Sequence, residues 1–207
     1  MRKQNGIELY IKNGSSLATV GSSADFSFIR NLNIGTDSVL NRIYLLAAGW
    51  GPKNQGNVTL ISMNGSSGAI DNQTLISNNT KGILVTGLQV DSVNGDVYVF
   101  QPVNLSTEAY ALNATSGSLV NNINLPVNYA TVPVGKNKGI SFIIGTSVSS
   151  GSIYIFNATT GKLIKTAQTG SLEGTETMAY YPKTGVLYYV SYDQPEEIAV
   201  LNLSQIS

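Results

Sequence analysis

The sequence predicts an all-β protein built from repeated four-stranded antiparallel units. Apolar and β-branched residues alternate with a period of two along short segments, and no segment of 11 or more residues keeps apolar side chains at helical spacing. One hairpin also recurs along the chain. Its turn asparagines are spaced 49, 44 and 45 residues apart, at Asn64, Asn113, Asn157 and Asn202. A period of this length is typical of one four-stranded unit.

The clearest copy of this hairpin lies at Gly151–Gly170. Ile153 and Ile155 alternate with aromatic side chains in its first strand, as expected for a pleated and packed surface. The strand stops at an Asn-Ala-Thr-Thr-Gly turn, whose residue types favour side-chain-to-backbone hydrogen bonds and positive φ. Further copies begin at Asn57, Thr107 and Glu196, the last in shortened form.

A second hairpin recurs between these copies, with a glycine three residues before an aromatic. The pairs are Gly95 and Tyr98, Gly139 and Phe142, and Gly185 and Tyr188, and Asn41 and Tyr44 stand in the same relation in the first copy. Asn94-Gly95 predicts a two-residue hairpin turn in which both residues take positive φ.

In chain order, the pattern predicts fifteen strands after a partial unit at residues 6–20. They lie at 26–34, 42–48, 57–63 and 69–76; 83–91, 96–101, 107–113 and 118–125; 129–135, 139–146, 151–157 and 162–169; and 176–181, 186–192 and 196–202. The units therefore span about 26–76, 83–125, 129–169 and 176–202, and the last lacks its fourth strand.

Four-stranded units that repeat every 40–50 residues are the mark of β-propeller blades. The segments GSIYIFNATTGKLIKT, from Gly151, and AYYPKTGVLYYVSY, from Ala179, resemble the YVTN-type repeats of surface-layer propellers and, more weakly, quinoprotein-type repeats. The resemblance covers about residues 26–202 and implies a propeller at the cell surface. It names no partner, since one fold hosts many functions.

The predicted blades number about four, whereas closed propellers have four to eight. We expect these 207 residues to form about half of a seven- or eight-bladed ring. Further sequence or a second copy of the chain would complete it. An open fragment exposes edge strands, which favours self-association.

The composition excludes several function classes. The chain has no cysteine and no histidine, which removes disulfides, thiolate zinc sites and imidazole bases. Twelve basic and twelve acidic residues cancel, so nucleic acid is not an expected partner. No apolar run reaches the roughly 18 residues of a membrane span. The polar first residues show no signal peptide.

Nine Asn-X-Ser/Thr sequons are candidate glycosylation sites: Asn13, Asn57, Asn64, Asn72, Asn78, Asn104, Asn113, Asn157 and Asn202. A chain with many Asn, Ser and Thr turns also produces sequons by chance. Together with the low charge, they favour an exported, extracellular or cell-surface protein of archaeal type.

Two acidic groups are weak candidates for metal binding. Asp91, Asn94 and Asp96 lack the glycine and the final acidic residue of a calcium loop, so the turn interpretation is preferred. The second group, Asp193, Glu196 and Glu197, fits a solvated loop better. We therefore predict no catalytic residue, cofactor or metal site.

Aromatic side chains offer a different kind of site. Most tyrosines alternate along strands, where packing between sheets explains them. Trp50 and Tyr192 lie near loops and are the candidate binding aromatics.

The function expected from the sequence is a non-enzymatic propeller that binds protein or glycan at the cell surface. Two alternatives remain. The chain could be a structural subunit of a surface layer or filament that pairs through edge strands. It could also be part of a quinoprotein-like or lactonase-like enzyme whose site lies outside this chain.

Overall fold

A computed structural model describes residues 10–12, 19–22, 29–49, 58–77, 87–92, 94–103, 106–127, 134–137, 140–147, 151–168, 175–181, 183–191 and 194–203. Within these ranges every regular element is a β-strand. The same ranges contain no helix that could span a bilayer.

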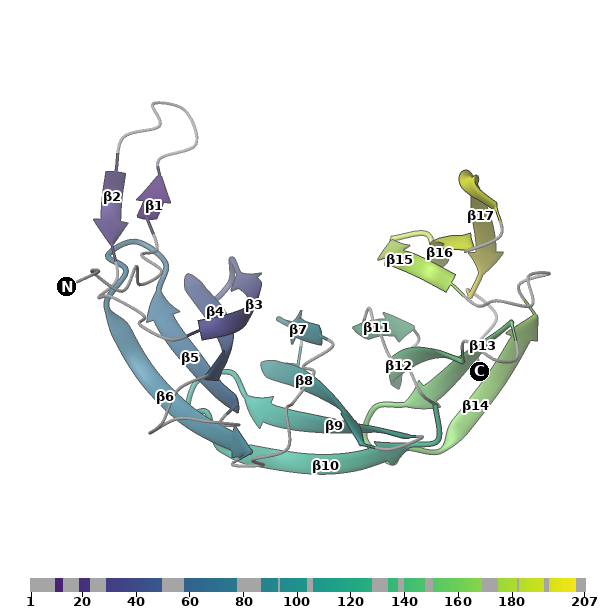
Figure 1. Ribbon diagram of the computed structural model, residues 1–207, viewed down its shortest axis with the longest axis horizontal. Coiled ribbons are helices and arrows are strands. Elements are labelled where there is room, and N and C mark those ends of the chain that lie inside the picture. The colour runs from purple at the N-terminus through teal and green to yellow at the C-terminus, as the bar shows by residue number, and fades with distance from the viewer. Residues whose placement is uncertain are drawn as a thin grey trace. The chain divides into compact units, whose positions relative to one another are not determined.

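Three sheets have four strands each, in consecutive order (Figure 1). The first sheet contains β3 (Ile29–Asp37), β4 (Arg42–Gly49), β5 (Val58–Asn64) and β6 (Ile70–Ser77). The second contains β7 (Gly87–Asp91), β8 (Asp96–Val103), β9 (Ser106–Asn113) and β10 (Leu119–Leu125). The third contains β11 (Val134–Asn137), β12 (Ile140–Ser147), β13 (Ser152–Asn157) and β14 (Leu163–Gln168).

The two remaining sheets are smaller. The last sheet has three strands: β15 (Thr175–Tyr181), β16 (Val186–Ser191) and β17 (Gln194–Asn202). At the start of the chain, β1 (Tyr10–Lys12) and β2 (Thr19–Ser22) pair as an antiparallel N-terminal hairpin. The all-β fold of repeated four-stranded sheets is therefore confirmed.

The chain divides into two compact units. Met1–Val99 and Ala111–Val120 form one, and Phe100–Tyr110 and Asn121–Ser207 form the other. The buried cluster of the first unit lies on β4 and β5 and consists of Leu45, Ala47, Ile61 and Met63, with Ile43 against it. In the second unit, the fully buried side chains include Phe142, Ile143, Ile144, Ile153, Ile155 and Phe156.

The strands lie close to their predicted places, but β3 ends at Asp37 rather than at the predicted residue 34. Asp37 still pairs with Arg42 in the antiparallel ladder. Its Oδ1 atom then accepts hydrogen bonds from the backbone N–H groups of Val39, at 2.8 Å, and Leu40, at 3.0 Å. The turn begins only after this carboxylate because its oxygen satisfies the turn amides.

The turn at Asn94-Gly95 also differs from its prediction. Gly95 has a φ of 72°, but Asn94 is not a positive-φ residue. The Gly95 N–H donates to the Asp91 carbonyl at 2.9 Å, so four residues, not two, separate β7 from β8. The Asp91 side chain accepts the backbone N–H of Asn94 at 3.2 Å. This carboxylate cap stabilises the longer turn, as the Asp37 cap does in the first sheet.

One backbone hydrogen bond marks equivalent positions in the four larger sheets. In each, the residue after the turn asparagine donates to a carbonyl at the start of the second strand: Gly65 to Asn41, Ala114 to Gly95, Ala158 to Ser141, and Leu203 to Gly185, at 2.7–2.9 Å. Counting three residues on from each acceptor places Tyr44, Tyr98, Ile144 and Tyr188 at one shared position.

This equivalence corrects the predicted alignment of Gly139 and Phe142 with Gly95 and Tyr98. In the third sheet, Asn137 pairs with Ile140, which leaves a two-residue turn. In the first sheet, the pairing of Asp37 with Arg42 leaves four residues. Because the third sheet has the shorter turn, its second strand starts earlier, and Ser141 rather than Gly139 corresponds to Gly95.

Candidate functional site

The turn asparagines close their own turns. The Oδ1 atoms of Asn64, Asn113 and Asn157 each accept two backbone N–H groups, from the residues two and three positions further on, at 2.8–3.0 Å. Four residues after each asparagine stands a glycine with φ of 68–75°. This Asx-type cap explains these three asparagines physically. Glycosylation of their sequons stays a prediction.

In the first unit, such a turn docks on the preceding sheet. Asn72 Nδ2, on β6, donates to the Ser116 carbonyl at 2.6 Å, and Thr74 Oγ1 donates to the Gly117 carbonyl at 3.0 Å. A Cβ atom on Gly117 would collide with Asn72 Nδ2. The glycine is therefore required by close approach as well as by its φ.

Two side chains of β4 hold the same turn from its other side. Arg42 Nη1 donates to the carbonyls of Ala114, at 2.7 Å, and Thr115, at 2.8 Å. The buried hydroxyl of Tyr44 donates to the Ala114 carbonyl at 2.9 Å, and burial raises the pKa of this phenol. Arg42 also lies 3.7 Å from an Asp71 carboxylate oxygen. The turn is thus fixed by five side-chain hydrogen bonds in all.

The second unit repeats the docking. Asn121 Nδ2, on β10, donates to the Thr159 carbonyl at 2.7 Å. A Cβ atom on Gly161 would collide with the Ile123 side chain. Asn72 and Asn121 each stand eight residues after a turn asparagine, so the docking follows the sequence repeat. Of the predicted sequons, Asn72 thus uses its amide nitrogen to join two sheets.

The other predicted site residues are less informative. Asn202 ends β17. The remaining sequon asparagines and both candidate binding aromatics lie outside the described residues: Asn13, Asn57, Asn78, Asn104, Trp50 and Tyr192.

The acidic candidates fit turns rather than a metal site. The Asp91 carboxylate accepts hydrogen bonds from the backbone and side-chain nitrogens of Asn94, as the turn interpretation expects. Burial, and then repulsion from Asp91, raise the pKa of Asp96. Within the described ranges, no three acidic side chains gather in a way that could hold a metal ion. Asp193 lies outside these ranges, and the side chains of Glu196 and Glu197 are not described.

A surface that the sequence analysis did not single out distinguishes the last sheet. Equivalent positions on the second and third strands are buried in the other sheets: Tyr44, Leu46, Leu60 and Ser62 in the first; Tyr98, Phe100, Ala109 and Ala111 in the second; and Ile144, Thr146, Ile153 and Ile155 in the third. In the last sheet, Tyr188 is 40% exposed, Ile198 70% and Val200 59%.

Strand pairing shows that these side chains share one side of the sheet. Tyr188 stands opposite Ala179 on one neighbour and opposite Val200 on the other. Tyr181 lies on the same side, opposite Val186, and is also exposed. We call the surface formed by Ala179, Tyr181, Tyr188, Ile198 and Val200 the open face. It is apolar and carries no charged group.

The opposite side of the last sheet is covered. Tyr180 lies there, paired with Leu187, and its ring meets Phe142 of the third sheet edge to face, with centroids 5.1 Å apart. Phe142 belongs to the side of the third sheet that corresponds to the open face, since Ile144 stands two residues further along β12. One sheet therefore covers the next through unlike sides.

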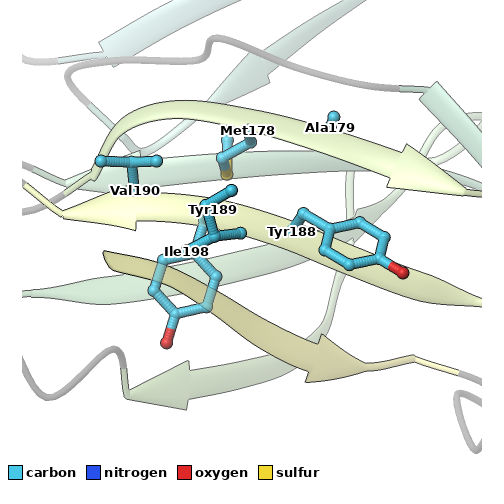
Figure 2. Close-up of a pocket in the computed structure, with 6 residues that line it drawn as sticks. All are labelled: Met178, Ala179, Tyr188, Tyr189, Val190 and Ile198. Atoms are coloured by element: carbon cyan, nitrogen blue, oxygen red, sulfur yellow. The ribbon is translucent and has the colours of Figure 1, made fainter. Parts of the chain in front are cut away.

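A shallow hollow of about 180 Å³ lies in the last sheet, lined by Met178, Ala179, Tyr188, Tyr189, Val190 and Ile198. Figure 2 shows these residues on all three strands, β15, β16 and β17. Its volume is below the roughly 300 Å³ at which small-molecule sites begin. The hollow is suited to receive a side chain of an opposing surface.

The open face could have been noticed from the sequence, because Ile198 and Val200 repeat the positions of Ile153 and Ile155. What the sequence could not give is exposure. An apolar residue at a repeated position looks the same whether a neighbouring sheet covers it or not.

Two solved structures resemble this chain. The Dos1 propeller matches 97% of this chain and 53% of its own, with 11% identity and a TM-score of 0.66. BBS1N in its complex with ARL6DN matches 98% of this chain and 60% of its own, with 14% identity and a TM-score of 0.63. The chain thus spans just over half the length of these proteins. No family model matches the sequence, and no curated protein does either. The likeness shows the β-propeller fold.

Proposed function

We propose that this chain is a non-enzymatic β-propeller interaction module that binds protein through its open face. The observation that carries the proposal is the exposure of Ile198 and Val200 at positions that are buried in the other three sheets. A contiguous apolar surface of this kind is typical of protein contacts. Glycan is a weaker candidate for this surface because aliphatic side chains dominate it and charged groups are missing from it.

The contacts inside the molecule indicate the chemistry of the partner. Where the corresponding side of the third sheet is covered, the covering group is Tyr180, from the opposite side of another β-sheet. The expected occupant of the open face is therefore a β-sheet with apolar side chains on its contacting side. The hollow beside Ile198 would take one of those side chains.

The resemblance to solved structures supports an interaction role in general terms. BBS1N, which shares the fold at 14% identity, was solved in complex with a protein, ARL6DN. That partner belongs to BBS1N. For this chain, the similarity supports only the idea that a propeller of this kind can serve as a protein-binding scaffold.

We further propose that the module works outside the cell or at its surface, as a propeller of the YVTN surface-layer type. The support is the recurrent hairpin, the nine sequons and the absence of cysteine from the sequence. Fractionation of the native host, with intact mass spectrometry of the recovered protein, tests both export and glycosylation. An intracellular, unmodified protein would overturn this part of the proposal.

Hydroxyl-radical footprinting of the protein from its native host tests the open face. We expect Tyr188 and Ile198 to be protected in the native form and labelled after dilution and mild dissociation. Leu119 and Leu163 serve as matched controls because they are exposed on β10 and β14, outside the open face. Equal labelling of Ile198 and these controls in the native form would contradict the proposal.

A structural role in a layer or filament is a second candidate, favoured by one observation. Among the described residues, no strand pairs with the outer side of β17, whereas β6, β10 and β14 occupy that place in the other sheets. A nine-residue unpaired edge can add strands from other chains. Electron microscopy of the purified chain distinguishes ordered arrays from discrete particles.

A further inference from the structure

We propose that the open face binds the N-terminal end of a second copy of this chain, so that two copies complete one propeller. This inference rests on the proposed function and names its partner. It begins from the incomplete sheets. In the part of the chain that the structure describes, the three inner sheets have four strands, whereas the N-terminal hairpin has two and the last sheet three. Both ends of the repeat array are therefore unfinished.

The contacts between sheets determine which surface should meet the open face. Phe142 and Tyr180 show that one sheet packs against the next through unlike sides, the later sheet presenting the side opposite to its own open-face side. No described contact joins two like sides. A second copy that continues this pattern must therefore approach with the start of its array, where the N-terminal hairpin lies, and not with its own open face.

The length of the chain fits two copies. One chain covers 53% of the Dos1 propeller and 60% of BBS1N, so two copies span about one whole propeller of this kind. A head-to-tail contact either closes into a ring or continues as a filament. Because two chains already supply the length of a closed propeller, closure at two copies is the expected outcome.

The charges of the chain do not oppose this association. Twelve basic and twelve acidic residues give a net charge of zero, so two copies do not repel each other at long range. The open face itself is uncharged. The contact should therefore be driven by apolar burial and should persist when the salt concentration is raised.

Light scattering of the purified chain tests the inference directly. The wild type should have twice the mass of 21.9 kDa. Ile198→Asp should give a folded monomer, because the substitution places a charge in the contact at a position that is 70% exposed within one chain. Leu119→Asp is the matched control, since Leu119 is 58% exposed on β10, and should remain a dimer. A monomeric wild type, or a dimeric Ile198→Asp variant, would overturn the proposal.

Cross-linking tests the head-to-tail arrangement. The chain has no cysteine, so each introduced thiol is unique. A short bismaleimide should join Ile198→Cys to Thr19→Cys when the two variants are mixed and allowed to exchange subunits, because Thr19 begins β2 of the N-terminal hairpin. Efficient cross-linking of Ile198→Cys to itself would mean that two open faces meet, and the proposal would be wrong. So would a mixture in which no cross-link forms.

The two levels of the argument fail separately. If footprinting shows Ile198 to be protected, but light scattering and mass spectrometry find one copy bound to a different protein, the interaction role stands and the second copy is excluded. If Ile198 is labelled freely in the native protein, both proposals are wrong.

Discussion

The third and last sheets carry similar side chains at equivalent positions in opposite surroundings. Ile153 and Ile155 of β13 are fully buried, whereas Ile198 and Val200 of β17 are 70% and 59% exposed. The turns after these strands make the same backbone hydrogen bond, from Ala158 to Ser141 and from Leu203 to Gly185. The difference therefore lies outside the hairpin. What separates the two sheets is whether another sheet covers them.

This contrast suggests that the last sheet has the side chains of an inner sheet. A strand that normally faces water alternates apolar and polar residues, and its outer positions are rarely two adjacent aliphatic groups. Ile198 and Val200 instead follow the inner pattern. The following variants either weaken or sharpen that comparison.

Truncation of equivalent isoleucines should give the largest difference. Ile153→Ala removes fully buried methyl groups and should lower the free energy of unfolding by about 2–5 kcal/mol. Ile198→Ala should change it by no more than about 0.5 kcal/mol, because the side chain is mostly exposed. Urea unfolding at concentrations where the chain is monomeric measures both. Similar losses would mean that the open face is covered within one chain.

Glycines with the same φ but different neighbours should give the next effect. Gly95 has a φ of 72° and open space around its Cβ position, so Gly95→Ala should cost only the left-handed strain, about 1–2 kcal/mol. Gly117→Ala has the same strain and also displaces Asn72 and Thr74, so it should cost at least about 1 kcal/mol more. Equal losses in urea unfolding would show that the docked turn adds no stability.

Equivalent tyrosines provide a finer test. Tyr44→Phe loses the buried hydrogen bond to the Ala114 carbonyl and should cost about 1 kcal/mol, a modest value because Arg42 also donates to that carbonyl. Tyr188→Phe should leave the free energy of unfolding of the monomer unchanged within about 0.5 kcal/mol, since Tyr188 is partly exposed. The reverse order would contradict the equivalence of the two positions.

The smallest effect is expected at the start of β8, where Asp96 stands in place of Val186 of the last sheet. Burial raises the pKa of Asp96, so its ionisation disfavours the folded state, and stability is lost as the pH rises through that raised pKa. Asp96→Asn should therefore raise the melting temperature at neutral pH. The gain should vanish below the ordinary aspartate pKa of 3.8, where both states are protonated. A gain that persists there would assign the effect to packing.

Much of the fold was predictable because its signals are local. The turn residues Asn113 to Gly117 cap their own turn through Asn113 Oδ1 and a positive-φ glycine, and both are visible in the sequence. The alignment of Gly139 with Gly95 was wrong because turn length depends on which residues pair. Asn137 pairs with Ile140, and that register is set by the ladder and not by the glycine.

The candidate site was less predictable. Trp50 and Tyr192 were chosen as loop aromatics and lie outside the described residues, whereas the open face consists of strand residues such as Tyr188 that looked like ordinary packing groups. Asn72 was expected only as a sequon, and its role in docking depends on a turn 44 residues away. Neither role has a local signal.

The sequence by itself determined the strands, their turns and the repeat, because alternation, side-chain caps and glycine conformations act within a few residues. Only the tertiary structure decided which repeated positions are buried. Burial depends on whether another sheet lies against a side chain, and the contacts that provide it, such as Phe142 with Tyr180, join residues far apart in the chain. The same aliphatic pair therefore forms core in β13 and surface in β17.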